Sequence, residues 1–337
     1  MIHAYAATEQ KGELKPFEYD PGPLRAGDIE IDVHACGLCH SDVSVLHNEW
    51  GFSKYPIVAG HEVVGRVAAR GEGVTHLNIG DWVGLGWYSN SCMVCRWCLG
   101  GEPHLCPQSE ATIVRRYGGF ADKVRCSAAW AVRLPSGIDA NKVGPLFCGG
   151  ITVFHPLLAF GVKPTDRVGV IGIGGLGHLA LQFLNKWGCE VTAFTSSDSK
   201  SDEAKQMGAH RVVSSRDSDA LKKEKGRHDF ILSTVNVALD WSQYVAALAP
   251  KGRLHTVGAV LSPISVGAFD LIGGEKSVSG SPVGSPATVS SMLDFCVRHD
   301  IAPITEEFAM ADINDAIEHL IAGNARYRIV LRNPDNA

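Results

Sequence analysis

Two different hydrophobic patterns divide the chain near residue 150. The first 150 residues carry short alternating or apolar runs separated by Gly, Pro and Asp turns, which predicts a β-rich region. From about residue 150 onward, short β-branched runs alternate with segments whose apolar residues recur at helical spacing. This alternation is typical of parallel βαβ units, in which helices cover the sheet.

The second pattern is clearest at residues 167–171, a β-branched run that predicts a strand. The apolar residues that follow predict a helix with one apolar face, namely Leu176, Leu179, Ala180, Phe183, Leu184 and Trp187. Further strands are expected at residues 191–194, 211–213, 230–234, 253–257 and 278–281. After residue 282 the alternation stops, and helices at 288–298 and 313–322 precede an end strand at 327–331.

These patterns predict a discontinuous organisation. A chain of 337 residues exceeds one ordinary core, so two domains are expected. We assign residues 1–149 and 283–337 to a mostly-β domain, with a loop of distinct composition at 89–107, and residues 150–282 to an inserted α/β domain. The inserted domain is expected to be a Rossmann domain, a doubly wound parallel sheet that binds nucleotides.

Composition and charge limit the kinds of partner and the cellular compartment that we expect. The net charge of −5 is spread out without a Lys/Arg stripe, which argues against nucleic acid and anionic membranes. No run approaches eighteen apolar residues and the N-terminus lacks an apolar signal segment, so we expect a cytoplasmic protein. Ten cysteines in a reducing compartment are metal ligands or buried residues more often than disulfides.

The segment SCMVCRWCLGGEPHLC carries the strongest chemical signal. Its four cysteines have C-x2-C-x2-C-x7-C spacing and are Cys92, Cys95, Cys98 and Cys106. Four thiolates on short turns close the tetrahedral coordination of zinc and leave no open position, which predicts a structural zinc site. An iron–sulfur cluster is the alternative, because four thiolates suit it as well.

The segment VGVIGIGGLG lies between a predicted strand and a predicted helix. Gly172, Gly174 and Gly177 fit G-x-G-x-x-G, whose glycines let backbone N–H groups approach a pyrophosphate at the helix N-terminus. The surrounding βαβ pattern therefore favours a dinucleotide site.

The end of the next strand, in EVTAFTSSDSK, bears on which dinucleotide binds. NAD sites usually carry Asp or Glu about 20 residues beyond the glycines. Here Thr195, Ser196, Ser197 and Lys200 follow instead, which favours the 2′-phosphate of NADP(H), with NAD(H) as the alternative. Asp198 lies close by and, as an acidic residue, argues for NAD(H). The hydroxyl side chains have a second interpretation, because Ser and Thr also suit the N-cap of a helix.

A third signal is dispersed along the chain. Cys39, His61 in GHEVVG with Glu62 beside it, and Cys148 in PLFCGG supply the two thiolates and one imidazole of a catalytic zinc site. Spacing alone does not single them out, since Cys148 also suits a core position and His61 a turn.

Together these motifs resemble the zinc-containing medium-chain alcohol dehydrogenases, over essentially the whole chain. Within that family the sequence is most similar to the cinnamyl-alcohol-dehydrogenase-type aldehyde reductases, on GHEVVG, the four-cysteine loop, GIGGLG and the terminal RYRIVL. The resemblance implies a GroES-like catalytic domain for 1–149 and 283–337, two zinc ions per subunit, and a homodimer or homotetramer.

The resemblance also implies residue roles. Cys39, His61 and Cys148 would bind the catalytic zinc, with Glu62 as a nearby or exchanging ligand and Asp42 orienting His61. Other residues implied to act in catalysis or to line the substrate channel are Ser41, which starts the proton relay, Trp50 and Trp87. The two tryptophans have ordinary burial as their alternative reading. The residues expected to bind the cofactor are His40, Thr152, Gly172, Gly174, Gly175, Leu176, Gly177, Thr195, Ser196, Ser197, Lys200, Thr234, Val257, Gly258, Ala259, Gly280, Ser281 and Arg328.

One position departs from the family pattern. Members commonly have a histidine five residues after the first zinc cysteine, where this chain has Ser44. The nearest histidine is His47, so the proton leaves through His47 or through water. We expect activity with a shifted pH profile.

The expected function is that of a zinc-dependent alcohol dehydrogenase or aldehyde reductase. It would exchange a hydride between NADP(H) and a primary alcohol or aldehyde of aromatic or medium aliphatic type. The alternatives are a polyol or sugar dehydrogenase of the same superfamily, and a non-catalytic nucleotide-binding protein on this fold.

Overall fold

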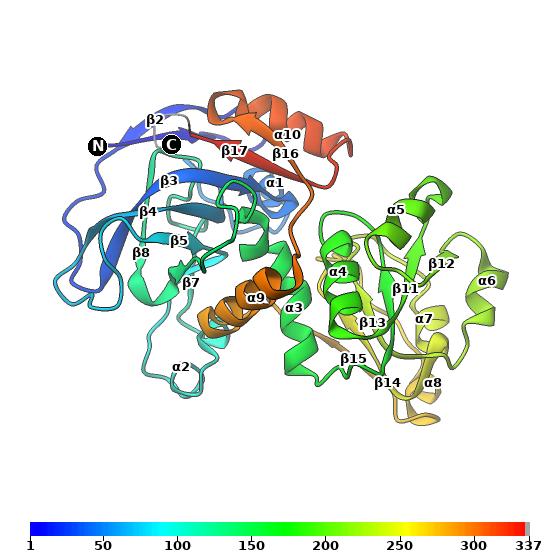
Figure 1. Cartoon of the computed structure of the whole chain (residues 1–337). Helices are drawn as coiled ribbons and strands as arrows, with labels where there is room; N and C mark the ends of the chain where they lie inside the picture. Colours follow the sequence, from blue (N-terminus) through cyan, green and yellow to red (C-terminus); the bar gives the residue numbers. More distant parts are fainter. Residues whose placement is uncertain (334–337) are drawn as a thin grey trace. The chain divides into compact units, whose positions relative to one another are not determined.

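The computed structural model describes residues 1–333 and forms two compact units (Figure 1). The first unit comprises Met1–Ile151 and the chain from Val283 onward, and the second comprises Thr152–Pro282. Helix α3 (Gly149–Ala159) contains the first of the two boundaries.

The first unit is built on a seven-stranded sheet. Its strand order is β16-β17-β3-β4-β5-β9, and β8 also pairs with β3. The strands are β3 (Asp28–Leu38), β4 (Glu62–Arg70), β5 (Trp82–Leu85), β8 (Lys123–Ser127), β9 (Val132–Arg133), β16 (Thr305–Ala309) and β17 (Arg328–Arg332). The last strand of the described chain thus lies antiparallel to β3, near the beginning of the chain.

Strand β3 shows why this sheet forms. Ile29, Ile31 and Val33 alternate along it and are fully buried, as expected for a strand with one face on the core. Between them, the Glu30 and Asp32 carboxylates accept hydrogen bonds from the Arg125 and Lys123 side chains of β8, each at 2.7 Å. Alternation of apolar and charged positions therefore fixes the register of β3 against β8.

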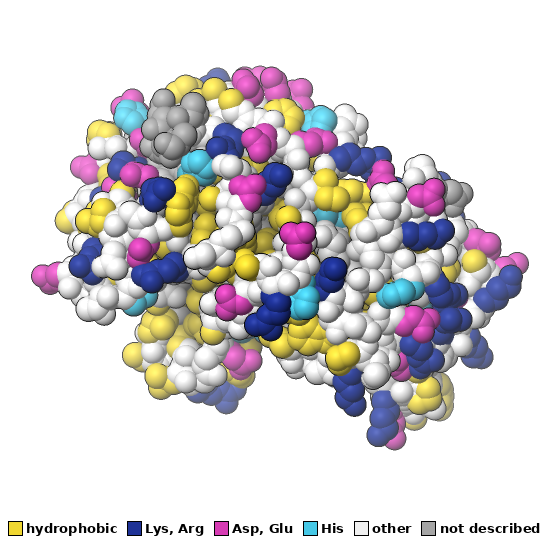
Figure 2. All heavy atoms as spheres, viewed as in Figure 1, with side chains coloured by type: hydrophobic (Ala, Val, Ile, Leu, Met, Phe, Trp, Pro, Cys, Tyr) yellow, Lys and Arg dark blue, Asp and Glu magenta, His cyan; other side chains and the backbone are white. Residues whose placement is uncertain are grey.

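Smaller elements complete the first unit. They are the ribbon of β1 (Ile2–Ala6) and β2 (Lys15–Tyr19), the pair β6 (Tyr88–Asn90) and β7 (Glu110–Ala111), and helices α1 (His40–Leu46), α2 (Arg96–Leu99), α9 (Pro286–His299) and α10 (Ile313–Ile321). The lobe between β6 and β7 carries α2, and Figure 2 shows hydrophobic side chains gathered on its surface. Met93, Val94 and Leu99 are exposed there.

The second unit contains a six-stranded parallel sheet with the order β12-β11-β10-β13-β14-β15. The strands are β10 (Arg167–Ile171), β11 (Glu190–Thr195), β12 (Arg211–Ser214), β13 (His228–Ser233), β14 (Leu248–Thr256) and β15 (Ser277–Gly280). Counted from β10, this is the order 3-2-1-4-5-6 of the Rossmann fold, so the predicted fold class is confirmed. Helices α4 (Gly177–Trp187), α5 (Ser201–Gln206), α6 (Ser218–Lys223), α7 (Trp241–Ala247) and α8 (Ala268–Ile272) connect the strands.

Differences from the predicted elements lie mainly at their ends. Strand β14 begins five residues earlier than predicted, and the final strand starts at Arg328 instead of residue 327. Strand β16 was not anticipated, because its sequence TEEFA is polar and only part-buried. None of the helices in residues 1–333 is long and apolar enough to cross a bilayer.

Candidate active site and metal centres

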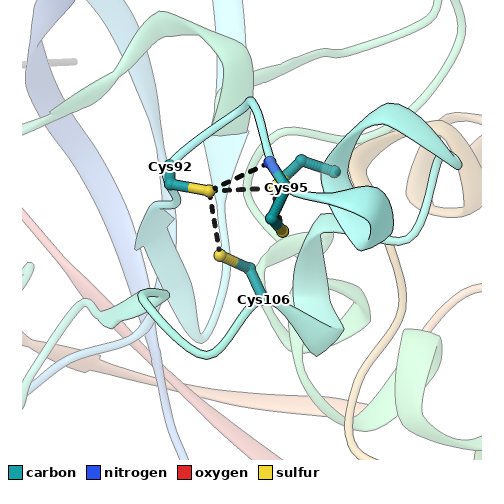
Figure 3. Close-up of side chains that lie close together, drawn as sticks. Cys92, Cys95 and Cys106 are labelled. Carbon is teal, nitrogen blue, oxygen red and sulfur yellow. Dashed lines mark hydrogen bonds between the residues drawn. The ribbon is translucent and has the colours of Figure 1, made fainter.

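The lobe between β6 and β7 brings together the four thiols of Cys92, Cys95, Cys98 and Cys106. Figure 3 shows three of them, Cys92, Cys95 and Cys106. Sulfur–sulfur distances are 3.9 Å from Cys92 to Cys98, 3.6 Å from Cys95 to Cys98 and 3.5 Å from Cys106 to Cys92. Tetrahedral zinc with Zn–S bonds of about 2.3 Å separates its sulfurs by about 3.8 Å. The spacing of the four thiols therefore fits one tetrahedral zinc ion.

Backbone groups of the same lobe favour the thiolate form. The N–H of Cys95 donates to the Cys92 sulfur at 3.4 Å, and the N–H of Gln108 donates to the Cys106 sulfur at 3.3 Å. Hydrogen bonds from the Val94 and Cys95 backbone lower the pKa of Cys92 to about 6. Burial raises the pKa of Cys98 to about 11, so the backbone favours the metal-binding thiolate form at Cys92 and not at every thiol of the lobe.

A second cluster joins residues that lie far apart in the sequence. Cys39, His61, Glu62 and Cys148 are all buried, and their ligand atoms lie within 4.8 Å of one another. Cys39 directly follows β3 and caps α1, His61 directly precedes β4, and Cys148 precedes α3. The Cys39 and Cys148 sulfurs are 3.9 Å apart, which again suits tetrahedral zinc.

Asp42 orients this mixed cluster. One carboxylate oxygen accepts from the Cys39 N–H at 2.9 Å, and the other accepts from the Gly60 N–H at 2.9 Å and from His61 Nδ1 at 2.8 Å. A carboxylate that accepts this bond places the imidazole proton on Nδ1, so Nε2 keeps its lone pair. His61 Nε2 is buried and has no hydrogen-bond partner within residues 1–333, as a metal ligand requires.

Arg328 and Glu62 form a buried ion pair beside the same thiols. The guanidinium Nη1 lies 4.0 Å from the Cys39 sulfur. The pKa of Cys39 lies well below its ordinary value, chiefly through the hydrogen bond from Cys148 and further through the charge of Arg328. Burial raises the pKa of Glu62 to about 7, against the opposing charge of Arg328. Sequence reasoning expected Arg328 at the cofactor and missed this pair.

Helix α1 carries the residues expected to handle the proton. Ser41 is half-buried in its first turn, and His40 is exposed at its first position. Ser44 is buried and donates its hydroxyl proton to a Glu49 carboxylate oxygen at 2.6 Å. His47 caps the helix, with Nδ1 4.0 Å from the other Glu49 oxygen, and partial burial lowers the pKa of His47. Glu49 was not anticipated from the sequence.

A row of aromatic rings leads away from His61 of the mixed cluster. The Trp87 ring lies edge-on to His61 at 5.0 Å between centroids, and Trp50 lies edge-on to Trp87 at 5.9 Å. Phe52 continues the row, 5.7 Å from Trp50. The structure thus brings both predicted tryptophans beside the mixed cluster and adds Phe52, which sequence reasoning missed.

In the second unit, the glycine-rich loop connects β10 to α4. Gly172 has φ +87°, which favours glycine, and a Cβ on Gly177 would collide with the Gly172 carbonyl. Thr234 donates its hydroxyl proton to that carbonyl at 2.9 Å. These contacts hold the loop tightly at the N-terminus of α4, while a Cβ on Gly174 would meet open space. Gly175 and Leu176 complete the turn into the helix.

Hydroxyls and one lysine lie at the end of β11, close to this loop. Thr195 ends the strand, Ser196 is exposed, and Ser197 is half-buried with its hydroxyl 2.7 Å from that of Ser199. The ammonium of Lys200 donates to the Ile173 carbonyl inside the glycine-rich loop at 3.1 Å. The side chain of Asp198 lies outside the described part of the chain.

The remaining predicted cofactor residues divide between the units. Those in the second unit, apart from Thr152 in α3, follow or end its strands β14 and β15, namely Val257, Gly258, Ala259, Gly280 and Ser281. The carboxyl ends of parallel strands are where such sheets bind ligands. His40 and Arg328 belong to the first unit.

Comparisons with known proteins agree with this geometry. Residues 25–136 match the alcohol dehydrogenase GroES-like domain, and residues 175–298 match the zinc-binding dehydrogenase family. The chain is 57% identical over 336 residues to the aldehyde reductase AdhA of Synechocystis sp., covering 100% of each chain.

Two solved structures extend the likeness to the fold. A cinnamyl alcohol dehydrogenase of Sorghum bicolor is 36% identical with a TM-score of 0.94, covering 98% of this chain and 97% of that one. A CAD of Helicobacter pylori complexed with NADP(H) is 29% identical with a TM-score of 0.89, over the same shares. The chain therefore belongs to the zinc-binding medium-chain alcohol dehydrogenases, as an enzyme of the group that includes aldehyde reductases and cinnamyl alcohol dehydrogenases.

Proposed function

We propose that this enzyme reduces aldehydes to primary alcohols, and catalyses the reverse reaction, with NADP(H) as the hydride carrier. The observation that carries the proposal is the buried cluster of Cys39, His61 and Cys148, in which His61 Nε2 has no hydrogen-bond partner within residues 1–333. Two thiolates and one imidazole are a catalytic ligand set that leaves the fourth position to substrate. The aromatic row beside His61 supports aromatic or medium aliphatic substrates over polyols.

Two zinc ions per chain would be held. Zinc at Cys39, His61 and Cys148 would act as a Lewis acid on the substrate oxygen, while the four-thiol lobe would hold a structural ion. Asp42 fixes the imidazole tautomer, and Arg328 places a buried positive charge beside two thiols and Glu62. Arg328 thereby offsets part of the negative charge that the ligands bring.

The residues of α1 and the aromatic row complete the site. Ser41 binds the substrate oxygen and passes the proton between that oxygen and the solvent side. His47, half-buried at the end of the same helix, exchanges this proton with solvent, with water as the alternative carrier. Trp87 and Trp50 form an apolar wall that excludes water from the reacting carbonyl.

NADP(H) supplies the hydride, and the second unit supplies its binding site. The glycine-rich loop at the N-terminus of α4 suits the pyrophosphate. Ser196, Ser197 and Lys200 at the end of β11 suit the 2′-phosphate that NADP(H) carries and NAD(H) lacks. The NADP(H) complex of the Helicobacter pylori relative supports this choice.

The test combines metal analysis with cofactor oxidation. Zinc per chain is measured first, and oxidation of NADPH and NADH is then followed with benzaldehyde, cinnamaldehyde and short aliphatic aldehydes. We expect two zinc ions per chain and faster oxidation of NADPH. A two-zinc protein that reduces none of these aldehydes would contradict the proposed activity, and faster oxidation of NADH would contradict the cofactor assignment.

A matched pair of variants sharpens the cofactor test. Lys200→Ala removes the ammonium beside the glycine-rich loop, and we expect the NADPH preference to fall by about tenfold, as the loss of one charge-assisted contact predicts. Lys205→Ala, an exposed position on α5, serves as the control and should leave the preference in place.

A further inference from the structure

A hollow of about 460 Å³ opens on the first unit at the far end of the aromatic row. Its apolar walls include Val45 of α1, Phe52 and Ile113. The volume lies within the range of small-molecule sites. Phe52 belongs both to this hollow and to the aromatic row, so the two features meet at this residue.

This continuity leads back to the mixed metal cluster. From Phe52 the ring contacts run through Trp50 and Trp87 to His61, with centroid distances between 5.0 and 5.9 Å. All of these residues belong to the first unit. The three ring contacts together span about 17 Å, so only an apolar molecule of comparable length could have one end at His61 and the other at the hollow.

The hollow differs from the aromatic row in its charge. Lys54, Arg115 and Arg116 line it, and its lining includes no Asp or Glu. Arg116 is engaged, because it pairs with Glu110 and donates to the Arg125 carbonyl at 3.0 Å. Lys54 and Arg115 are exposed and make no ion pair within residues 1–333.

Exposed cations are common on any protein surface and usually carry no function. These two stand out by position, because both flank an apolar hollow that shares Phe52 with the aromatic row beside His61. The chain as a whole has a net charge of −5, so a positively charged hollow does not follow from its average composition. Guanidinium and ammonium groups at the edge of an apolar cavity suit a carboxylate at the end of an apolar chain.

We infer that the preferred substrates are amphipathic aldehydes with an apolar body and a carboxylate at the far end, the ω-oxo carboxylates. This inference rests on the proposed function and names its substrate class. The aldehyde carbon takes a hydride from NADPH and its oxygen takes one proton, giving an ω-hydroxy carboxylate and NADP⁺. The distal carboxylate is unchanged by the reaction and binds at Lys54 and Arg115.

The experiment compares n-alkanals with ω-oxo carboxylates of equal length, from six to sixteen carbons. We expect kcat/KM to favour the carboxylate by about fivefold or more at the lengths that reach the hollow, as two partly exposed ion pairs predict. The shortest alkanal and the ω-oxo carboxylate of equal length should show no such difference in kcat/KM. The carboxylate preference should also weaken as salt screens the charges.

Charge-removing variants test the location. The double variant Lys54→Gln/Arg115→Gln should lose the carboxylate preference, whereas Lys15→Gln, an exposed control in the same unit, should retain it. Equilibrium binding of the ω-hydroxy carboxylate against the matching alkanol, measured by calorimetry on the zinc-loaded enzyme, should show the same pattern. Thermal melting verifies that each variant is folded.

The outcomes separate the two proposals. If no alkanal or aromatic aldehyde is reduced, the proposed function itself fails. If alkanals are reduced and the carboxylate confers no advantage at any length, only the substrate class is overturned. A carboxylate preference that persists in the double variant also overturns the assignment to this hollow.

Discussion

The two thiol clusters of this enzyme are built in opposite ways. The four thiols of the lobe lie within Cys92–Cys106, and Cys92 and Cys95 are partly exposed. The mixed cluster gathers Cys39, His61 and Cys148 from three separate elements, and all of its members are buried. Local backbone N–H groups prepare the lobe, whereas the mixed cluster depends on Asp42 and Arg328.

We expect this difference to separate the two sites by role, with the lobe stabilising the fold and the mixed cluster carrying out the chemistry. Under the proposed function, a set of four thiolates would saturate zinc, and this site would serve to hold the lobe together. A set of three ligands leaves one position, and the buried surroundings strengthen every electrostatic interaction at that position. Variants that remove a ligand from one cluster or the other test this difference.

The largest expected effect is the loss of turnover on removing a ligand of the mixed cluster. His61→Gln should lower kcat by at least about a thousandfold, because Lewis-acid stabilisation is worth several kcal/mol. Zinc content should fall by one ion per chain. Cys126→Ala, a buried cysteine outside both clusters, is the control and should keep both ions. Retained turnover in His61→Gln would contradict the assignment.

Removing a ligand of the lobe should instead act on stability. Cys98→Ser should release one zinc ion per chain and lower the melting temperature by about 5 °C or more, since structural zinc contributes directly to folding. Turnover per folded molecule should remain within about threefold of the parent. Cys189→Ala, a buried cysteine of the second unit, is the control. Lost turnover with unchanged melting would place chemistry in the lobe.

The buried pair of Arg328 and Glu62 predicts an intermediate effect. Arg328→Met leaves an uncompensated carboxylate and should cost about 3–5 kcal/mol in the free energy of unfolding. The double variant Glu62→Gln/Arg328→Met removes both charges and should recover part of that loss. Urea unfolding of the parent, both single variants and the double variant measures the coupling. Strictly additive losses would show that the two side chains do not stabilise each other.

The smallest expected effect concerns proton transfer through His47. Burial places its pKa below the ordinary 6.5, so alcohol oxidation should slow as the pH falls through that lower pKa and protonates the base. His47→Asn should remove this acidic limb and lower kcat by about a hundredfold. His3→Asn, a mostly exposed histidine of the same unit, is the control. An unchanged pH profile in His47→Asn would leave water as the proton carrier.

The sequence predicted the features that depend on neighbours along the chain. The four-cysteine spacing placed all ligands of the lobe in one loop, and G-x-G-x-x-G between strand and helix identified the β10–α4 turn. The pairing of Arg328 with Glu62 was out of reach, because it joins residues 266 positions apart through the alignment of β17 with β3. The Ser44–Glu49 hydrogen bond and the place of Phe52 depend likewise on side-chain packing that no spacing rule encodes.

The position of β17 has a consequence for biosynthesis. A ribosome makes Cys39, His61 and Cys148 long before it reaches Arg328, the first residue of the final strand. Until that strand joins β3, the nascent ligands lack the cation that lies beside them in the finished enzyme. The lobe has all its ligands within a short stretch of nascent chain and can be completed early. The mixed cluster therefore gains its buried cation only after β17, made 180 residues later than Cys148, has joined the sheet.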